Sequence, residues 1–344
     1  MKALTYDAHG GTDVLQYKDV ASPSPQADDV IVDVAATTVN HLDLIQRAGY
    51  FTLDGYALPH IAGMDVVGTV IEVGANVTRV AVGDRVVIDP SMHCAPDGSA
   101  YGGENDLYGK LGVIGATLNG GYADQCLAPQ THVYAIPDDI SFEHAVVFPT
   151  AWMTAHHALF DVGMLEAGET VMIHAAASGV SIAAIQWAKS VGAIVLATAG
   201  SEEKCQKALE LGADHTCNNR SEDVAKWARE KTAGKGVDMV FDHVGAALWA
   251  PSMFSLKPRG RLVNCGNTSG DAATIPSLGF MYHMGIKILG SDPYRYDEFE
   301  GAWKSYCAGK FDPVIDTVFA LEDGAEAQTK LEKADCVGKL ILKP

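Results

Sequence analysis

A short run of small residues, Ala176–Ser181, could bind a phosphate group through its backbone. It follows Thr170–Ala175, an apolar stretch whose length suits a buried strand, and precedes Ile182–Val191, which carries apolar residues at helical spacing. A strand, a tight turn and a helix in this order place the free N–H groups of the helix N-terminus where an anion can bind. A second apolar strand, Ile194–Thr198, completes a βαβ unit of the kind that binds dinucleotides.

The turn by itself is a weak fingerprint for such a site. The pattern G-x-G-x-x-G has three glycines, and here Ala176, Ser178 and Ser181 replace them. Small residues still allow a tight turn, and the hydroxyl of Ser178 or Ser181 could donate to a phosphate. The alternative is an ordinary turn of a doubly wound sheet, so the rest of the chain has to decide between the two.

The end of the second strand indicates which dinucleotide would bind. Proteins that bind NAD in this way place an acid there, which bonds the ribose 2′-hydroxyl. The chain reads Thr198-Ala199-Gly200-Ser201 at this point, so the acid is missing and a 2′-phosphate has room. Ser201 and Lys204 could bond that phosphate, and Arg220 could close over it. The pattern favours NADP(H), with a solvated Lys204 and a surface Arg220 as the alternative interpretation.

Composition restricts the class of protein. The chain has 344 residues, 48% of them hydrophobic, which suits a soluble α/β protein with two domains. Its formal net charge of −18 argues against a nucleic-acid partner, because such partners require basic surfaces. The 7 cysteines are scattered without a C-x-x-C pair, which favours neither a disulfide framework nor a clustered zinc site. We find no membrane span and no export signal, and therefore expect a cytoplasmic protein without a membrane partner.

Two patterns divide the chain into domains. Short strands with Gly-rich turns over roughly the first 140 residues suggest a small, irregular β-barrel. Strands then alternate with helices, which indicates a parallel, doubly wound sheet. Asp312–Phe319 and Val337–Leu342 look like strands that return to the first domain. We expect an α/β protein with one domain of residues 1–139 and 311–344 and another of residues 140–310.

Several separate motifs together resemble the medium-chain dehydrogenase/reductase superfamily. They are Asn40-His41-x-Asp43, Gly63-Met64-Asp65-x-x-Gly68, Gly83-Asp84-Arg85-Val86, Gly120-Gly121-Tyr122-Ala123, Thr154, the turn and helix described above, Leu211-Gly212-Ala213-Asp214, Asp242-His243-Val244-Gly245 and Gly338-Lys339. The resemblance covers essentially the whole chain. It implies a GroES-like barrel domain that carries catalysis, a Rossmann domain that binds the dinucleotide, and an active site between them.

The resemblance raises the question of a catalytic metal. Zinc alcohol dehydrogenases of this superfamily use a Cys, a His-Glu pair and a further Cys or Asp, and the matching positions here are Asn40, Met64, Asp65 and Thr150. Asn, Met and Thr are poor zinc ligands, and Asp65 alone cannot hold the ion. The family's structural zinc lobe has four closely spaced cysteines, whereas the matching stretch offers only Cys94. We therefore expect a zinc-free member with no bound metal.

Zinc-free members that resemble this chain mostly reduce quinones, enones or enoyl thioesters. The resemblance implies hydride transfer from NADPH to an activated double bond, with polar donors that stabilise the negative charge on oxygen. Asn40 and Asp43 fall where quinone oxidoreductases have an Asn and an Asp near the nicotinamide, and Tyr50 falls at an aromatic position. Tyr50, His60 and Tyr108 are candidates for the proton donor. Asp43 could instead only cap the helix that follows it.

The predicted site residues fall into two groups, one for each domain. The predicted catalytic residues are Asn40, Asp43, Tyr50 and His60. The predicted cofactor-binding residues are Thr154, Ala177, Ser178, Gly179, Val180, Ser201, Lys204, Arg220, Val244, Cys265 and Gly266.

Several alternatives stay open at the level of sequence. The substrate could be an enoyl-CoA such as acrylyl-CoA, with Lys110 near its phosphate. The protein could also be a zinc alcohol dehydrogenase with unusual ligands, or a non-catalytic nucleotide-binding protein like the lens crystallins of this group. Relatives commonly dimerise by joining Rossmann sheet edges, so we expect a homodimer, or a homotetramer, through Ile286–Gly290 and Ser291–Tyr296.

Overall fold

The computed structural model describes residues 1–92, 112–295 and 297–344. The chain forms two compact units. Unit 1 is Met1–Thr150 with Tyr294–Pro344, and unit 2 is Ala151–Pro293. The domain boundaries predicted near residues 139 and 310 remain predictions; the compact units divide the chain at residues 150 and 293 instead. No helix in the described ranges is long and apolar enough to cross a membrane.

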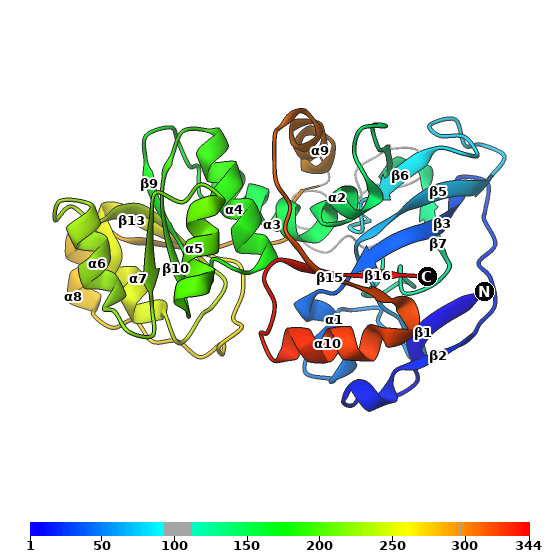
Figure 1. Cartoon of the computed structure of the whole chain (residues 1–344), viewed down its shortest axis with the longest axis horizontal. Coiled ribbons are helices and arrows are strands. Elements are labelled where there is room, and N and C mark those ends of the chain that lie inside the picture. The colour runs from blue at the N-terminus through cyan, green and yellow to red at the C-terminus, as the bar shows by residue number, and fades with distance from the viewer. Residues whose placement is uncertain (93–111, 296) are drawn as a thin grey trace. The chain divides into compact units, whose positions relative to one another are not determined.

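Unit 2 is built on a six-stranded parallel sheet in the order β11-β10-β9-β12-β13-β14 (Figure 1). Its strands are β9 (Thr170–Ile173), β10 (Ile194–Ala199), β11 (His215–Asn218), β12 (Val237–Asp242), β13 (Leu256–Asn264) and β14 (Lys287–Gly290). Its helices are α3 (Met153–His156), α4 (Gly179–Ser190), α5 (Glu202–Glu210), α6 (Val224–Lys231), α7 (Trp249–Ser255) and α8 (Leu278–Met284), with a π-helical segment over His157–Val162. The chain starts at β9, proceeds outward to β11 and then resumes at β12 on the other side. This order, with its switch point between β9 and β12, is that of the Rossmann fold.

The central strands of this sheet are largely buried, and most of their residues are apolar. Val171–Ile173 of β9 and the residues of β12 are buried, as expected for a parallel sheet covered on both faces. Helix α4 buries Ser181–Ala188, a run rich in alanine, and small side chains allow a helix to lie close to the sheet. The predicted strand, turn and helix of the βαβ unit are therefore present.

The described residues of unit 1 form two sheets. A three-stranded sheet has the order β2-β1-β4, and a seven-stranded sheet has the order β15-β16-β3-β5-β6-β8, with β7 paired to β3. The strands are β1 (Lys2–Tyr6), β2 (Gln16–Asp19), β3 (Asp29–Thr38), β4 (His60–Ile61), β5 (Val66–Val73), β6 (Arg85–Ile88), β7 (Gln125–Pro129), β8 (Val133–Ala135), β15 (Ile315–Ala320) and β16 (Lys339–Lys343). The helices are α1 (His41–Arg47), α2 (Phe142–Val146), α9 (Glu298–Ala308) and α10 (Gly324–Glu332). Shorter helical segments lie at Thr12–Val14, Gln130–His132 and Leu321–Asp323. A π-helical segment, Phe148–Trp152, spans the boundary of the unit.

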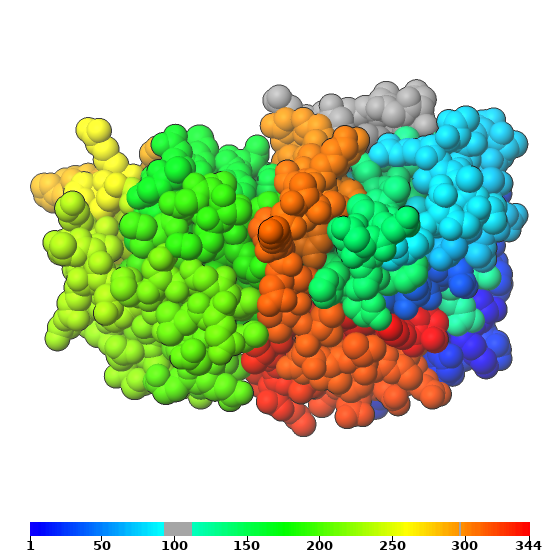
Figure 2. All heavy atoms as spheres, turned by 45° about the horizontal axis from the view of Figure 1, so that its top comes forward, coloured from blue at the N-terminus to red at the C-terminus, as the bar shows by residue number. Residues whose placement is uncertain are grey.

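The last segment of the chain completes the barrel of unit 1, as the sequence predicted. Strand β16 pairs antiparallel with the end of β3, where Ile341 lies opposite Thr38. In Figure 1 the red β16 runs beside the blue β3, and Figure 2 shows the orange and red surface of Tyr294–Pro344 against earlier parts of unit 1. This pairing brings the start of β16 to the start of α1, because α1 follows β3 directly.

Candidate active site

Four donors converge on the buried carboxylate of Asp65 in unit 1. Its Oδ2 accepts from the amide Nδ2 of Asn40 at 2.9 Å, from Lys339 Nζ at 3.3 Å, and from the hydroxyl of Thr38. Its Oδ1 accepts from the backbone N–H of Thr150 at 2.8 Å. Asp65 has 0% relative exposure and Lys339 has 7%. We call Thr38, Asn40, Asp65, Thr150 and Lys339 the polar hub.

Asn40 occupies the hub because of its place in the chain. It lies between the end of β3 and the first residue of α1, where it has extended backbone angles and acts as the N-cap. Its side-chain Oδ1 accepts from Lys339 Nζ at 2.7 Å, while its Nδ2 donates to Asp65. Both ends of the Asn40 amide are therefore held by groups of opposite charge.

Asp43 lies behind Asn40 rather than in the hub. Its Oδ2 accepts from the backbone N–H of Asn40 at 2.8 Å and from Tyr122 OH at 2.9 Å. Burial raises the pKa of Asp43 to about 6, although both hydrogen bonds act in the opposite direction. These contacts favour the alternative that the sequence left open, in which Asp43 caps α1 and fixes the backbone of Asn40.

The contacts of Asp65 bear directly on a catalytic zinc ion. The lone pairs of its carboxylate are engaged by four donors, and one of these is an ammonium group, which would repel a metal ion. Thr150 presents its backbone N–H rather than its hydroxyl to Asp65. Asn, Met and Thr at the neighbouring ligand positions are poor zinc ligands. The residues of the hub therefore do not fit zinc, and we derive no chemical step through a metal.

The structure does not bring the other two predicted catalytic residues to the hub. Tyr50 follows α1 and is 86% exposed. His60, on β4, is buried between the rings of Tyr6 and Tyr56, its Nε2 lies 3.0 Å from Gly115 O, and burial lowers its pKa. These contacts favour a structural role for His60.

Three residues named at the level of sequence lie outside the described residues. They are Cys94, Tyr108 and Lys110.

The predicted cofactor-binding residues gather at one edge of the sheet in unit 2. Except for Thr154, which lies on α3, they follow the carboxyl ends of the parallel strands or begin the next helix. Ligands of doubly wound sheets bind at this edge. In strand order they are Ala177, Ser178, Gly179 and Val180 after β9, Ser201 and Lys204 after β10, Arg220 after β11, Val244 after β12, and Cys265 and Gly266 after β13.

The turn after β9 corrects one expectation. Ser181 is fully buried, donates to His174 O at 2.6 Å and lies 2.8 Å from His243 Nε2, so its hydroxyl is not available to a phosphate. Ser178 and Gly179, at the start of α4, are partly exposed. The first-turn N–H groups of α4 have no acceptor within the helix, so they can bind an anion.

Sequence reasoning assigned no role to two histidines, His174 and His243, that lie beneath this turn. Ser252 Oγ donates to Leu248 O, so it must accept from His174 Nε2–H at 2.8 Å, and His174 Nδ1 then accepts from Thr198 Oγ1. Burial lowers the pKa of His174 to about 3, which keeps it neutral. By the same logic, His243 Nε2–H donates to Ser181. The sequence did contain a signal for this pair, because one histidine directly follows β9 and the other directly follows β12.

The end of β10 has the features expected for a 2′-phosphate. A Cβ atom on Gly200 would lie only 3.1 Å from Nε of Arg220, so the glycine leaves room for the guanidinium. Ser201 caps α5 by accepting from the backbone N–H of Lys204 at 3.3 Å. Glu202, the acid next in the chain, accepts from Asn218 Nδ2 at 2.8 Å. Arg220 itself is exposed and could reach an anionic ligand.

An open surface hollow lies after β13 and β14. Asn264, Cys265, Gly266, Asn267, Asp271, Gly290, Ser291 and Asp292 line it. It contains two of the predicted cofactor-binding residues, Cys265 and Gly266.

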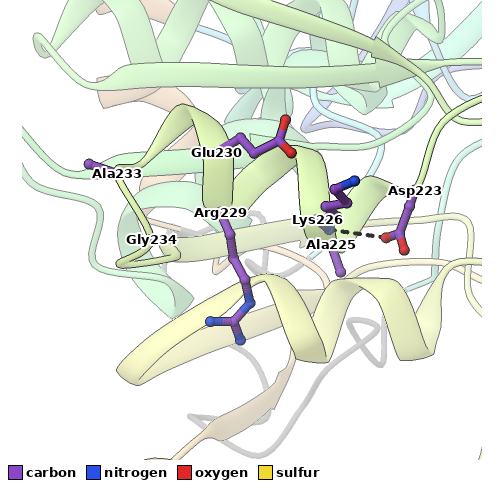
Figure 3. Close-up of a pocket in the computed structure, with 7 residues that line it drawn as sticks. All are labelled: Asp223, Ala225, Lys226, Arg229, Glu230, Ala233 and Gly234. Atoms are coloured by element: carbon purple, nitrogen blue, oxygen red, sulfur yellow. Dashed lines mark hydrogen bonds between the residues drawn. The ribbon is translucent and has the colours of Figure 1, made fainter.

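A different hollow, on α6, contains none of the predicted site residues. Figure 3 shows its lining of Asp223, Ala225, Lys226, Arg229, Glu230, Ala233 and Gly234. Its two acids and two bases balance in charge, and Arg229 donates to Phe254 O. We assign no function to this hollow.

Comparisons with known proteins identify the family. The family "Alcohol dehydrogenase GroES-like domain" matches residues 26–138, and the family "Zinc-binding dehydrogenase" matches residues 179–318. A quinone oxidoreductase of Pseudomonas aeruginosa is 32% identical over 355 residues, which cover 100% of this chain and 99% of that protein. The chain belongs to the medium-chain dehydrogenase/reductase superfamily. It is an oxidoreductase of the quinone oxidoreductase-like branch, with the predicted GroES-like and Rossmann-type folds.

Other relatives within the superfamily carry several different names. The acryloyl-coenzyme A reductase of Sulfurisphaera tokodaii is 31% identical, covering 95% of this chain and 96% of that protein. A solved NAD-dependent alcohol dehydrogenase is 36% identical, with a TM-score of 0.93 and 100% coverage of both chains. The Escherichia coli quinone oxidoreductase, solved in complex with NADPH, is 27% identical, with a TM-score of 0.83 and 100% coverage of both chains.

Proposed function

We propose that this oxidoreductase transfers hydride from NADPH, without zinc, to a quinone or to an α,β-unsaturated carbonyl compound such as an enoyl thioester. The observation that carries the proposal is the polar hub. At the positions where zinc enzymes of the superfamily have their ligands, this chain has Asn40 and an Asp65 carboxylate paired with Lys339. Without a Lewis acid to activate an alcohol, reduction of an activated double bond is the more suitable reaction.

NADPH is the proposed cofactor, in line with the solved Escherichia coli relative that contains it. The end of β10 lacks an acid for a ribose 2′-hydroxyl and has Arg220 beside Gly200 instead. In this proposal Ser201, Lys204 and Arg220 bind the 2′-phosphate. The first-turn N–H groups of α4 bind the pyrophosphate. Thr154, Cys265 and Gly266 are proposed to contact the nicotinamide end.

After hydride transfer from NADPH, the reaction requires a hydrogen-bond donor for the substrate oxygen and a source of a proton. Hydride addition to the electrophilic carbon leaves negative charge on the substrate oxygen, which requires a donor held in place beforehand. Asn40 is the proposed donor, since its Nδ2 carries a second hydrogen besides the one given to Asp65. A proton then neutralises the product. Tyr50 and water remain candidates for its source, whereas the contacts of His60 give it no support.

Alcohol oxidation is the competing function, because a solved relative is named an NAD-dependent alcohol dehydrogenase. Its usual activator would be zinc, and the contacts of Asp65 with Lys339 and Asn40 disfavour the ion. A non-catalytic role as a nucleotide-binding protein is the second competitor. It predicts tight binding of NADPH without oxidation.

One panel of assays on the purified protein separates these functions. NADPH and NADH oxidation would be followed by absorbance with quinones, enones and enoyl-CoAs, and the reverse reaction with alcohols and NADP⁺ or NAD⁺. Zinc content would be measured on the same sample by mass spectrometry. The proposal expects NADPH-dependent reduction by a protein with substoichiometric zinc and no loss of activity on chelation. Stoichiometric zinc with alcohol oxidation that is lost on chelation would reject it.

A further inference from the structure

The ammonium group of Lys339 is buried against three acceptors. It donates to Val39 O at 3.2 Å, to Asn40 Oδ1 at 2.7 Å and to Asp65 Oδ2 at 3.3 Å. An ammonium has three hydrogens, so these contacts use all of them. Lys339 therefore has no N–H left for a substrate, and any effect on the reaction must pass through the groups that it contacts.

The charges around Asn40 allow its amide only one orientation. Lysine can only donate and an ionised carboxylate can only accept, so Oδ1 must face Lys339 and Nδ2 must face Asp65. The flipped amide would place its NH₂ group against the ammonium and its oxygen against the carboxylate. One Nδ2 hydrogen remains beyond these two bonds, and Asn40 keeps 9% exposure.

A buried ion pair is a costly way to obtain stability alone. The cost of removing both charges from water can exceed their mutual attraction, and well-packed apolar residues often serve as well. The Asp65–Lys339 pair is nevertheless almost fully buried, and Thr38 and Thr150 add further donors to the carboxylate. The arrangement therefore suits a role in orientation.

We propose that Lys339 and Asp65 are positioning residues that hold the Asn40 amide in the orientation required for catalysis. The proposal rests on the proposed function, in which the free Nδ2–H of Asn40 donates to the substrate oxygen. Lys339 also polarises the amide through Oδ1, which strengthens Nδ2–H as a donor. A fixed ammonium, one amide away from the reacting oxygen, thus supplies the positive charge that zinc supplies in other members of the superfamily.

The test removes both charges together. Lys339→Met alone would leave a buried, unpaired carboxylate and could unfold the protein, whereas Asp65→Asn/Lys339→Met is neutral and close in size. The double variant is expected to lose about 10- to 100-fold in kcat, with an unchanged KM for NADPH. The matched control is Glu143→Gln/Lys343→Met, which removes a more exposed ion pair between α2 and the same strand, β16. This control is expected to keep the wild-type kcat.

Asn40→Ala distinguishes positioning from a general structural effect. This substitution removes the donor and is expected to cost about 100- to 1,000-fold in kcat. If Lys339 and Asp65 act through Asn40, adding Asp65→Asn/Lys339→Met to Asn40→Ala costs nothing further. Losses that multiply in the combined variant, or a wild-type kcat in Asp65→Asn/Lys339→Met, would overturn the proposal.

A second measurement does not depend on turnover. In ¹⁵N-asparagine-labelled protein, the Asn40 side chain is identified by the signal that disappears in Asn40→Ala. Its two amide protons should be separated in chemical shift by more than those of a solvent-exposed asparagine, because only one of them is bonded to a carboxylate, and this excess separation should shrink in Asp65→Asn/Lys339→Met. An unchanged Asn40 signal would contradict the positioning role. If the wild type reduces no substrate while the signal changes as expected, the proposed function fails and the positioning survives.

Discussion

At the residue scale, a glycine determines where a positive charge can lie. Gly200 has no side chain to occupy the end of β10, and the guanidinium of Arg220 takes that space. An acid in the same place would bind a ribose hydroxyl and repel a phosphate. The discrimination between the two nicotinamide cofactors should therefore depend largely on Arg220.

Replacement of Arg220 should weaken NADPH selectively. We expect Arg220→Gln to raise the KM for NADPH by about 10- to 100-fold, since a charge-assisted hydrogen bond is lost, and to leave kcat/KM for NADH nearly unchanged. Steady-state kinetics with both cofactors checks this. Lys226→Gln, the same change of charge on α6, is the control. Equal effects on the two cofactors would place the 2′-phosphate elsewhere.

We expect Asp89 to make the stability of unit 1 depend on pH. It accepts from Tyr294 OH at 2.6 Å and from the N–H of Ser91 at 3.0 Å, and burial raises its pKa to about 7. Because the folded state binds the proton more tightly than the unfolded state, the free energy of unfolding falls as pH rises from about 4 to about 7.

The variant Asp89→Asn tests this dependence, because the amide keeps an oxygen for both donors but cannot titrate. We expect the wild type to lose roughly 2–3 kcal/mol through this group between about pH 5 and about pH 8, and Asp89→Asn to lack that loss. Urea denaturation at the two pH values measures it. Parallel losses in both proteins would show that Asp89 is charged in the folded state at low pH.

The residues of the hub differ in how far sequence reveals them. Asn40 and Asp43 belong to a recognisable motif. The residue types at and around Asp65 also indicate, without a structure, that this set of residues is a poor zinc site. Lys339 belongs to the motif Gly338-Lys339, whose role the sequence does not reveal, because Asp65 and Lys339 are 274 residues apart. Only the pairing of β16 with β3 shows that the two meet. Long-range partners of this kind leave no local pattern.

At the element scale, the start of α4 shows how serine can replace a fingerprint glycine. The third glycine of the fingerprint permits close packing of helix and strand. Ser181 fits the same buried place because its hydroxyl bonds to His174 O and to His243. Sequence predicted the strand, turn and helix from periodicity, but it could not show on which side of the turn this hydroxyl would lie.

Ser181→Ala should therefore affect stability and spare the cofactor. The loss of these buried hydrogen bonds is expected to cost about 1–3 kcal/mol in the free energy of unfolding. The Kd for NADPH should stay within about twofold, because it is the helix N–H groups that bind the phosphate. Denaturation and fluorescence titration measure the two quantities. Weaker NADPH binding at unchanged stability would mean that the hydroxyl turns toward the phosphate.

The helices of unit 1 were harder to foresee than its strands. Apolar and polar residues alternate clearly in the strands, and the sequence predicted both β15 and β16 in the segment that returns to the first domain. The helices α9 and α10 were not predicted, although α9 buries Phe299, Trp303 and Tyr306. Those aromatic residues pack on Phe148, far away in the sequence, so the reason for their helical spacing lies outside their own segment.

At the scale of the whole molecule, the last strand of the Rossmann sheet in the described part of the chain carries exposed apolar side chains. β14 is the last strand in the sheet order, and Ile288 on it is 37% exposed. Leu278 and Tyr282 on α8 are 65% and 69% exposed. An edge strand with unpaired backbone groups and exposed apolar side chains is suited to pairing with another chain.

The homodimer predicted from sequence can be tested at this edge. We expect light scattering with size exclusion to give twice the 36.4 kDa of one chain. Ile288→Lys should shift the mass toward one chain, since it places a charge on the edge strand. Val318→Lys, on the 47% exposed Val318 of β15, is the control. A single-chain mass for the wild type would reject the dimer, and a fourfold mass would indicate the tetramer.

The wide separation of Asp65 and Lys339 also has a consequence for synthesis on the ribosome. At about 5–20 residues per second, roughly 14–55 s pass between the two residues. Unit 2 is encoded entirely in that interval, and all strands of its sheet lie within it. We therefore expect unit 2 to fold during translation. Unit 1 cannot complete its fold until β16 has been synthesised, and the Asp65 carboxylate should stay hydrated until Lys339 can pair with it.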